Sequence, residues 1–143
     1  MRQAIVLAKE AAEEGEVPVG AVVVLDGKIV GAGRNRREIS KNALAHAEIE
    51  AINEACRALG GWRLWQCDMY VTLEPCPMCT GAIINSRMKR LVYGASDYKA
   101  GSCGSVVDLF SLPYNHKPEV VSGVMQEECA ALLTDFFKKL RKK

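Results

Sequence analysis

The sequence contains no apolar run that approaches the roughly 20 residues of a membrane-spanning helix. The N-terminal segment MRQAIVLAKEAAEEGE carries several acidic side chains and no small-residue cleavage site. These two absences argue against a membrane anchor and against a signal peptide. The chain also has little net charge, +2 at pH 7, and this value is too small to indicate nucleic-acid binding by itself.

A disulfide framework is missing as well. The six cysteines of this 143-residue chain are irregularly spaced: Cys56, Cys67, Cys76, Cys79, Cys103 and Cys129. Secreted domains that disulfides stabilise carry regular cysteine patterns. Because this chain lacks such a pattern, we expect reduced thiols and a cytoplasmic location. In that compartment a close cysteine pair more often serves metal or redox chemistry.

The chain shows no internal repeat, low-complexity segment or linker, so we expect residues 1–143 to form one domain. Apolar periodicity indicates a first helix that ends at Gly15, and Asp26-Gly27 between two apolar runs predicts a β-hairpin. The expected elements are helix 3–14, strands 19–25 and 29–30, helix 45–59, strand 68–73, helix 76–86, strand 91–93, a helical turn at 106–110, strand 120–121 and a helix over 129–140. This order predicts a three-layer α/β/α sandwich, in which a mixed five-stranded sheet carries helices on both faces.

The motif TLEPCPMCTGA places Cys76 and Cys79 three residues apart at the start of a predicted helix. Both sulfurs then point the same way, and the helix N-terminus favours the thiolate form. A Cys-x-x-Cys pair can be a redox motif, half of a structural zinc site or half of a catalytic one. A closed four-cysteine site would need Cys67 or Cys103.

A catalytic zinc site needs a third protein ligand and keeps its fourth position open. The sequence has two histidines, His46 and His116. His46 is the better candidate because Glu48 follows two residues later, and a carboxylate beside an activated water is what hydrolysis requires. His116 has no carboxylate placed in this way.

The segments His46-Ala47-Glu48 and Pro75-Cys76-Pro77-Met78-Cys79 match the H-x-E…P-C-x-x-C signature of the zinc-dependent nucleoside and base deaminases. Beyond the signature, EVPVGAVVV, GRNR, MYVTLEPCPMC, LVYGASD and ECAALLTDFF resemble the bacterial tRNA-specific adenosine deaminase family over nearly the whole chain. The resemblance implies a cytidine deaminase-like fold and the conversion of adenosine to inosine at the wobble position of the tRNA anticodon loop.

The resemblance also assigns roles to residues. It implies that His46, Cys76 and Cys79 hold one zinc ion per subunit. Glu48 would take the proton of the attacking water, pass it to N1 of adenine and later protonate the leaving amine.

The residues that we expect to contact the substrate are spread over most of the chain. The residues that match substrate-binding positions of the family are Asn35, Val17, Pro18, Val19, Asp97, Asn115, Phe136 and Phe137. The implied partner is the tRNA anticodon stem-loop, and the implied assembly is a homodimer whose active sites are bordered by both subunits.

Two rival functions share parts of this pattern. A deaminase of a free base or nucleoside (guanine, cytosine or cytidine) would have the same zinc ligands and the same Glu48. The Arg-rich loop around Asn35 and the basic tail at 138–143 favour an RNA substrate, although such a tail is often only a solvated helix end. A zinc-stabilised RNA-binding module without catalysis would have no use for Glu48.

Overall fold

The computed structural model describes residues 1–142, so Lys143, the last residue of the basic tail, lies outside the described part. The elements within this range are α1 (Arg2–Glu13), β1 (Gly20–Leu25), β2 (Lys28–Arg34), α2 (Arg37–Ser40), α3 (Ala47–Leu59), β3 (Asp68–Leu73), α4 (Pro77–Asn85), β4 (Arg90–Ala95), the 3-10 turn η1 (Leu109–Ser111), β5 (Glu119–Val121) and α5 (Gln126–Arg141). None of the helices in residues 1–142 is both long and apolar enough to cross a bilayer.

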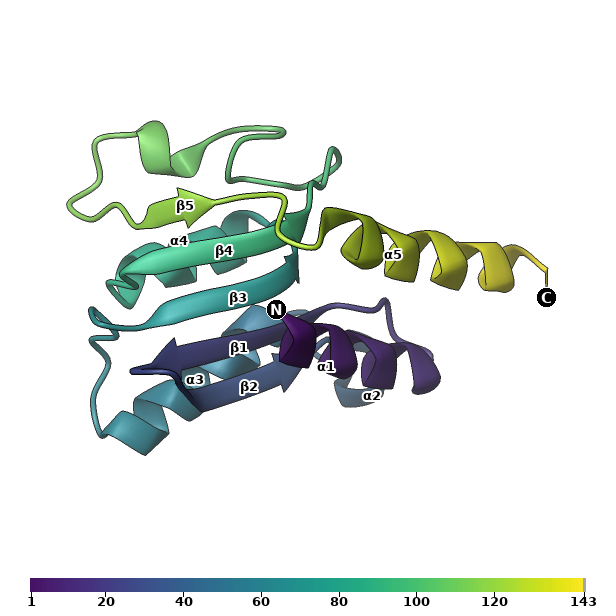
Figure 1. Ribbon diagram of the computed structural model, residues 1–143, viewed down its shortest axis with the longest axis horizontal. Coiled ribbons are helices and arrows are strands. Elements are labelled where there is room, and N and C mark those ends of the chain that lie inside the picture. Colours follow the sequence, from purple (N-terminus) through teal and green to yellow (C-terminus); the bar gives the residue numbers. More distant parts are fainter. Residues whose placement is uncertain (143) are drawn as a thin grey trace.

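The strands form one mixed sheet in the order β2-β1-β3-β4-β5 among the described residues. β1 is antiparallel to both of its neighbours, whereas β3, β4 and β5 run parallel to one another. The β1–β2 hairpin turns at Asp26 and Gly27, both with positive φ, as a tight two-residue turn requires. As a result β2, β3, β4 and β5 point the same way, and their carboxyl ends meet at one edge (Figure 1).

The sheet lies between two layers of helices. α3 and α4 pack on one face, and α1 and α5 pack on the other (Figure 1). Large apolar side chains between the sheet and the α3–α4 layer are fully buried, among them Met69, Ile83, Met88 and Leu91. The predicted three-layer sandwich with a five-stranded mixed sheet is therefore confirmed.

A glycine on β2 lets α3 approach the sheet closely at its first turn. A methyl group at Gly33 would overlap the backbone of Ala47, the first residue of α3. This contact fixes the position of the helix start, and the candidate active site is built there.

Most element boundaries differ by a few residues from the sequence-based expectation, as three examples show. β2 extends to Arg34, the helical turn in the long loop lies at Leu109–Ser111 instead of 106–110, and α3 starts at Ala47 rather than at 45. The short helix α2 was not predicted at all. It forms because the carboxylate of Glu16, buried and 22 residues away, accepts hydrogen bonds from the amides of Glu38 (3.1 Å) and Ile39 (2.7 Å).

Candidate active site

Strand ends and a helix start converge at one edge of the sheet. Asn35 directly follows β2, the segment Glu74–Cys76 follows β3, and Asp97 lies two residues beyond β4. α3 begins at the same edge, with His46 as the residue before its first turn. Together these segments line a cavity of about 190 Å³. A crevice outside the carboxyl ends of the strands is the usual ligand site of α/β sheets.

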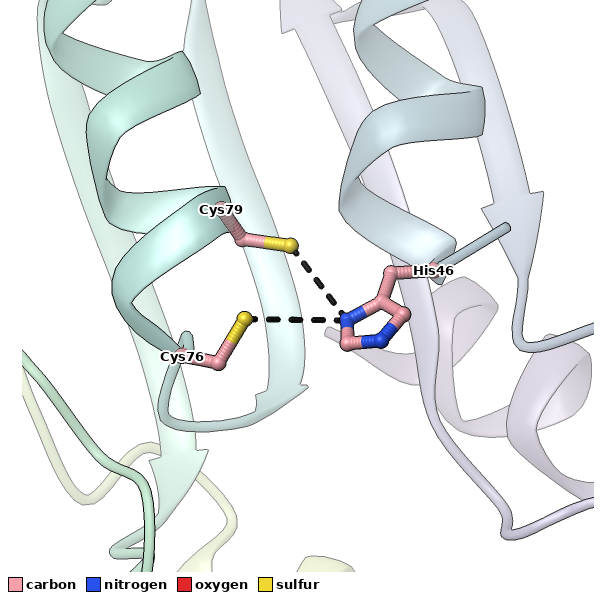
Figure 2. A group of neighbouring side chains, drawn as sticks. All are labelled: His46, Cys76 and Cys79. Carbon is pink, nitrogen blue, oxygen red and sulfur yellow. Dashed lines mark hydrogen bonds between the residues drawn. The ribbon is translucent and has the colours of Figure 1, made fainter. Parts of the chain in front are cut away.

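Three potential metal ligands lie together at this cavity, and two of them, His46 and Cys76, line it. Nδ1 of His46 is 3.7 Å from Sγ of Cys76 and 3.6 Å from Sγ of Cys79, and all three ligand atoms lie within 4.8 Å of one another. Cys76 is the N-cap of α4, and Cys79 lies in the first turn of that helix. Figure 2 shows the ring of His46, at the start of α3, pointing toward both sulfurs.

The spacing of these atoms fits a tetrahedral metal ion. Bond lengths of about 2.1 Å to nitrogen and about 2.3 Å to sulfur place tetrahedral nitrogen and sulfur ligands about 3.6 Å apart. The two observed nitrogen–sulfur distances agree with this value. Soft thiolates combined with an imidazole are a ligand set that zinc prefers. The described residues thus provide three potential ligands of a metal site, the number that a catalytic zinc site takes from the protein.

The surroundings of Cys76 favour the thiolate form, which is the form that binds a metal ion. A hydrogen bond with Cys79 and another with His46 lower the pKa of Cys76 to about 4, although burial opposes this shift. The hydrogen bond with Cys76 raises the pKa of His46. The pKa of Cys79 is raised by its hydrogen bond with Cys76, by burial and by the nearby Glu48. A cation bound here would displace the proton that the two sulfurs share.

Glu48 lies in the first turn of α3 and lines the same cavity. The residue is 4% exposed, and burial raises the pKa of its carboxyl group to about 7. The same carboxyl group also acts to raise the pKa of Cys79. A carboxyl group with a pKa near neutrality can both accept and return a proton at physiological pH.

The structure brings four of the predicted substrate-binding residues to this cavity. These residues are Val17, Val19, Asn35 and Asp97. The side chain of Asn35 is 8% exposed and is held in place, because its Nδ2 donates to the carbonyl of Val17 (3.0 Å) and its Oδ1 accepts from the amide of Arg37 (3.2 Å). That these four residues contact the substrate remains a prediction.

The other four predicted residues lie elsewhere. Pro18 is fully buried, and Asn115 is exposed in the loop before β5, at the opposite edge of the sheet. Phe136 and Phe137 stack edge to face on α5, and Phe136 lines a groove between α1 and α5. None of these four is among the described residues that line the cavity.

The alternative metal ligands are also distant from the cluster. Nε2 of His116 lies 2.7 Å from the carbonyl oxygen of Met88, just ahead of β4 and at the opposite edge of the sheet. Cys67 precedes β3 at that same edge. Sγ of Cys103 lies 3.3 Å from Oγ1 of Thr80, and Cys103 is not part of the ligand cluster found among residues 1–142.

Glu74, two residues before Cys76, also lines the cavity and was not among the site residues predicted from the sequence. The side chain is 2% exposed and accepts four hydrogen bonds, one each from the amides of Asp97 (3.1 Å), Cys103 (3.0 Å) and Ser105 (3.1 Å) and one from the hydroxyl of Ser105. Burial acts to raise its pKa, but these hydrogen bonds outweigh that effect and lower it. Glu74 therefore fastens the loop after β4 to the segment that carries Cys76. The feature of the sequence that could have indicated Glu74 is its position as a carboxylate beside a metal-ligand motif.

We expect Glu74→Gln to lower the free energy of unfolding by about 2 kcal/mol, because a buried amide NH₂ group would face backbone N–H donors. The KM for substrate should rise as the wall formed by Asp97 moves, while the metal content stays unchanged. Urea unfolding, steady-state kinetics and metal analysis would measure these effects. Glu127→Gln, which changes an exposed glutamate of α5, is the matched control. Unchanged stability in Glu74→Gln would contradict the fastening role.

With the geometry established, comparison with known proteins gives the class of the chain. The MafB19-like deaminase family matches residues 1–141, so the chain is a deaminase. The tRNA-specific adenosine deaminase of Bacillus subtilis (strain 168) is 51% identical over 144 residues, which cover 100% of this chain and 89% of that protein. The chain belongs to the family of tRNA-specific adenosine deaminases.

Solved structures agree with this assignment. A tRNA:A34 deaminase, studied for A-to-I editing at the wobble position of transfer RNA, superposes with a TM-score of 0.90 at 48% identity, covering 93% of this chain and 97% of that one. A guanine deaminase from Bacillus subtilis has a TM-score of 0.66 at 34% identity and covers 99% of this chain and 91% of its own. The greater likeness is therefore to the tRNA-acting enzyme.

Proposed function

We propose that this protein is a zinc-dependent tRNA adenosine deaminase that converts adenosine to inosine at the wobble position of the anticodon loop. The observation that carries the proposal is the buried Glu48 carboxyl group, which shares a cavity with His46 and Cys76 of the three-residue ligand cluster. A structural metal site needs no such carboxylate, which disfavours a non-catalytic RNA-binding module. The high identity to tRNA-specific adenosine deaminases supports the substrate.

The ligand set fits zinc, and a zinc ion held by His46, Cys76 and Cys79 would make water a nucleophile near neutral pH. Glu48 then performs the proton transfers. Its carboxylate takes the proton of the water that attacks C6 of adenine and delivers it to N1. It subsequently takes the remaining proton from the new hydroxyl group on C6 and transfers it to the departing amino group, so that the C6–N bond breaks as the C6 carbonyl forms. Adenosine and water thus give inosine and ammonia.

The remaining residues of the cavity bind and orient the base. Asn35 retains one amide hydrogen beyond its bond to Val17, and this group can donate to an edge of adenine. Val17 and Val19 offer apolar contact to the ring faces. An adenine inside a duplex cannot enter such a cavity, so the target must be unpaired, and an anticodon loop presents splayed bases at little cost.

We further propose that the protein acts as a cytoplasmic homodimer with one zinc ion per subunit. Its six cysteines are all free thiols, which suits a reducing compartment. The homodimer is the assembly that the resemblance to the tRNA-specific adenosine deaminase family implies. Light scattering should give twice the chain mass of 15.6 kDa, and a monomer at assay concentration would contradict this assembly.

The substrate assignment predicts that an anticodon stem-loop with adenosine at the wobble position is deaminated, whereas free guanine, cytidine and adenosine are turned over at least about 100-fold less efficiently in kcat/KM. A loop that holds the adenine beside the cavity supplies binding free energy that the free compounds lack. Released ammonia and inosine in the digested RNA would be measured. If only free bases or nucleosides lost ammonia, the RNA assignment would be wrong and the rival deaminase correct.

A further inference from the structure

Tyr98 is 82% exposed, more than any other large apolar or aromatic side chain in the described part of the chain. Isolated exposed apolar residues are common and need no explanation by themselves. This one differs in its position, because its neighbours Asp97 and Ala100 both line the active-site cavity. Its aromatic ring therefore stands in solvent beside the wall of the cavity that a substrate base must enter.

The backbone that carries Tyr98 is fixed on both sides. Oδ1 of Asp97 accepts hydrogen bonds from the amides of Lys99 (3.0 Å) and Ala100 (3.3 Å), and the carbonyl of Asp97 accepts from the amide of Gly101 (2.8 Å). The amide of Asp97 itself donates to Glu74, the buried carboxylate at the end of β3. Tyr98 thus lies in a closed turn that is anchored to the sheet, and its exposure does not arise from a loose segment.

We propose that Tyr98 is a stacking platform for the nucleotide next to the target adenosine, an inference that rests on the proposed function. When the adenine of a single-stranded loop enters the cavity, the adjacent base loses its stacking partner on that side. An aromatic side chain held beside the cavity restores a face for that base, and such stacking is tolerant of base identity. A free base or nucleoside has no adjacent nucleotide and gains nothing from the ring.

The first test compares Tyr98→Ala and Tyr98→Phe on the zinc-loaded enzyme with an anticodon stem-loop substrate. Loss of one base–aromatic stack should raise KM about 10-fold or more in Tyr98→Ala, with kcat nearly unchanged. Tyr98→Phe keeps the ring and should stay within about twofold of the parent KM. Both variants should unfold at the parent temperature, because the side chain makes little contact with the protein.

A second readout detects the stack directly. The fluorescent base 2-aminopurine is placed in turn on the 5′ and the 3′ side of the target adenosine, and its emission is recorded on binding. The parent and Tyr98→Phe should quench the probe on one of the two sides, and Tyr98→Ala should not. Val106→Ala, which trims a 58% exposed apolar side chain of the same loop, is the control and should match the parent in both readouts.

The outcomes separate this inference from the proposed function. A parent enzyme that fails to deaminate the stem-loop contradicts the proposed function itself. A parent that deaminates the stem-loop, with a Tyr98→Ala KM within twofold of its own, overturns the stacking role alone. Equal quenching by the parent and by Tyr98→Ala overturns it as well.

Discussion

Glu48→Gln should lower kcat for the RNA substrate by about a thousandfold, within the range of roughly 10²–10⁴ that general acid–base catalysis contributes. The amide has the shape of the carboxylate but cannot take the proton of the attacking water. Nor can it return a proton to N1 of adenine or to the leaving amine. Because Glu48 is not one of the three clustered ligands, the variant should still contain one zinc ion per chain.

Single-turnover kinetics and elemental analysis of the same sample would check both parts of this prediction. Glu54→Gln changes an exposed glutamate further along α3 and should keep kcat within about twofold, since exposed charges away from a site have small effects. A Glu48→Gln enzyme that retained zinc and more than a tenth of the parent kcat would remove Glu48 from the proton transfers.

Cys76→Ala should abolish zinc binding and deamination together, and it should lower the melting temperature of the zinc-loaded enzyme. Two protein ligands cannot hold a site that normally needs three. An ion that binds the folded chain but not the unfolded chain stabilises the fold through mass action. Loss of the ion therefore destabilises the fold. The parent treated with a strong chelator should therefore melt at nearly the same temperature as Cys76→Ala without chelator.

The control for this second prediction is Cys56→Ala, which changes a half-buried cysteine on α3 outside the ligand cluster. That variant should keep its zinc, its activity and its response to chelator. Elemental analysis and thermal unfolding measured with and without chelator separate the cases. Unchanged metal content in Cys76→Ala would show that the ligand set is different.

Local signals explain why much of the fold could be predicted from the sequence. Asp26-Gly27 sets the hairpin, and Pro77 begins α4 at a position where a missing N–H does no harm. The spacing of Cys76 and Cys79 and the pairing of His46 with Glu48 depend on helix geometry within one turn. His46, Cys76 and Cys79 lie together because strand–helix units carry them to the same edge of the sheet.

The features that could not be predicted depend on contacts between distant segments. α2 exists because Glu16 caps it from 22 residues away, and the hydrogen bonds of Glu74 require the loop after β4 to fold back onto β3. The direction of β5, which runs parallel to β4 and so places Asn115 at the edge opposite the cavity, leaves no local trace in the chain. Such features need the tertiary arrangement that they help to stabilise.

The attachment of the loop after β4 to Glu74 divides the site into two separately adjustable parts. The metal ligands and Glu48 belong to α3, to α4 and to the residue before each helix. Residues 98–100 belong to a turn that Glu74 holds through its hydrogen bonds with the amide of Asp97 and the hydroxyl of Ser105. Side chains in that turn can be exchanged without altering those bonds. Altered selectivity can therefore be sought by randomising residues 98–100 to side chains other than proline, with the metal ligands and Glu48 left unchanged.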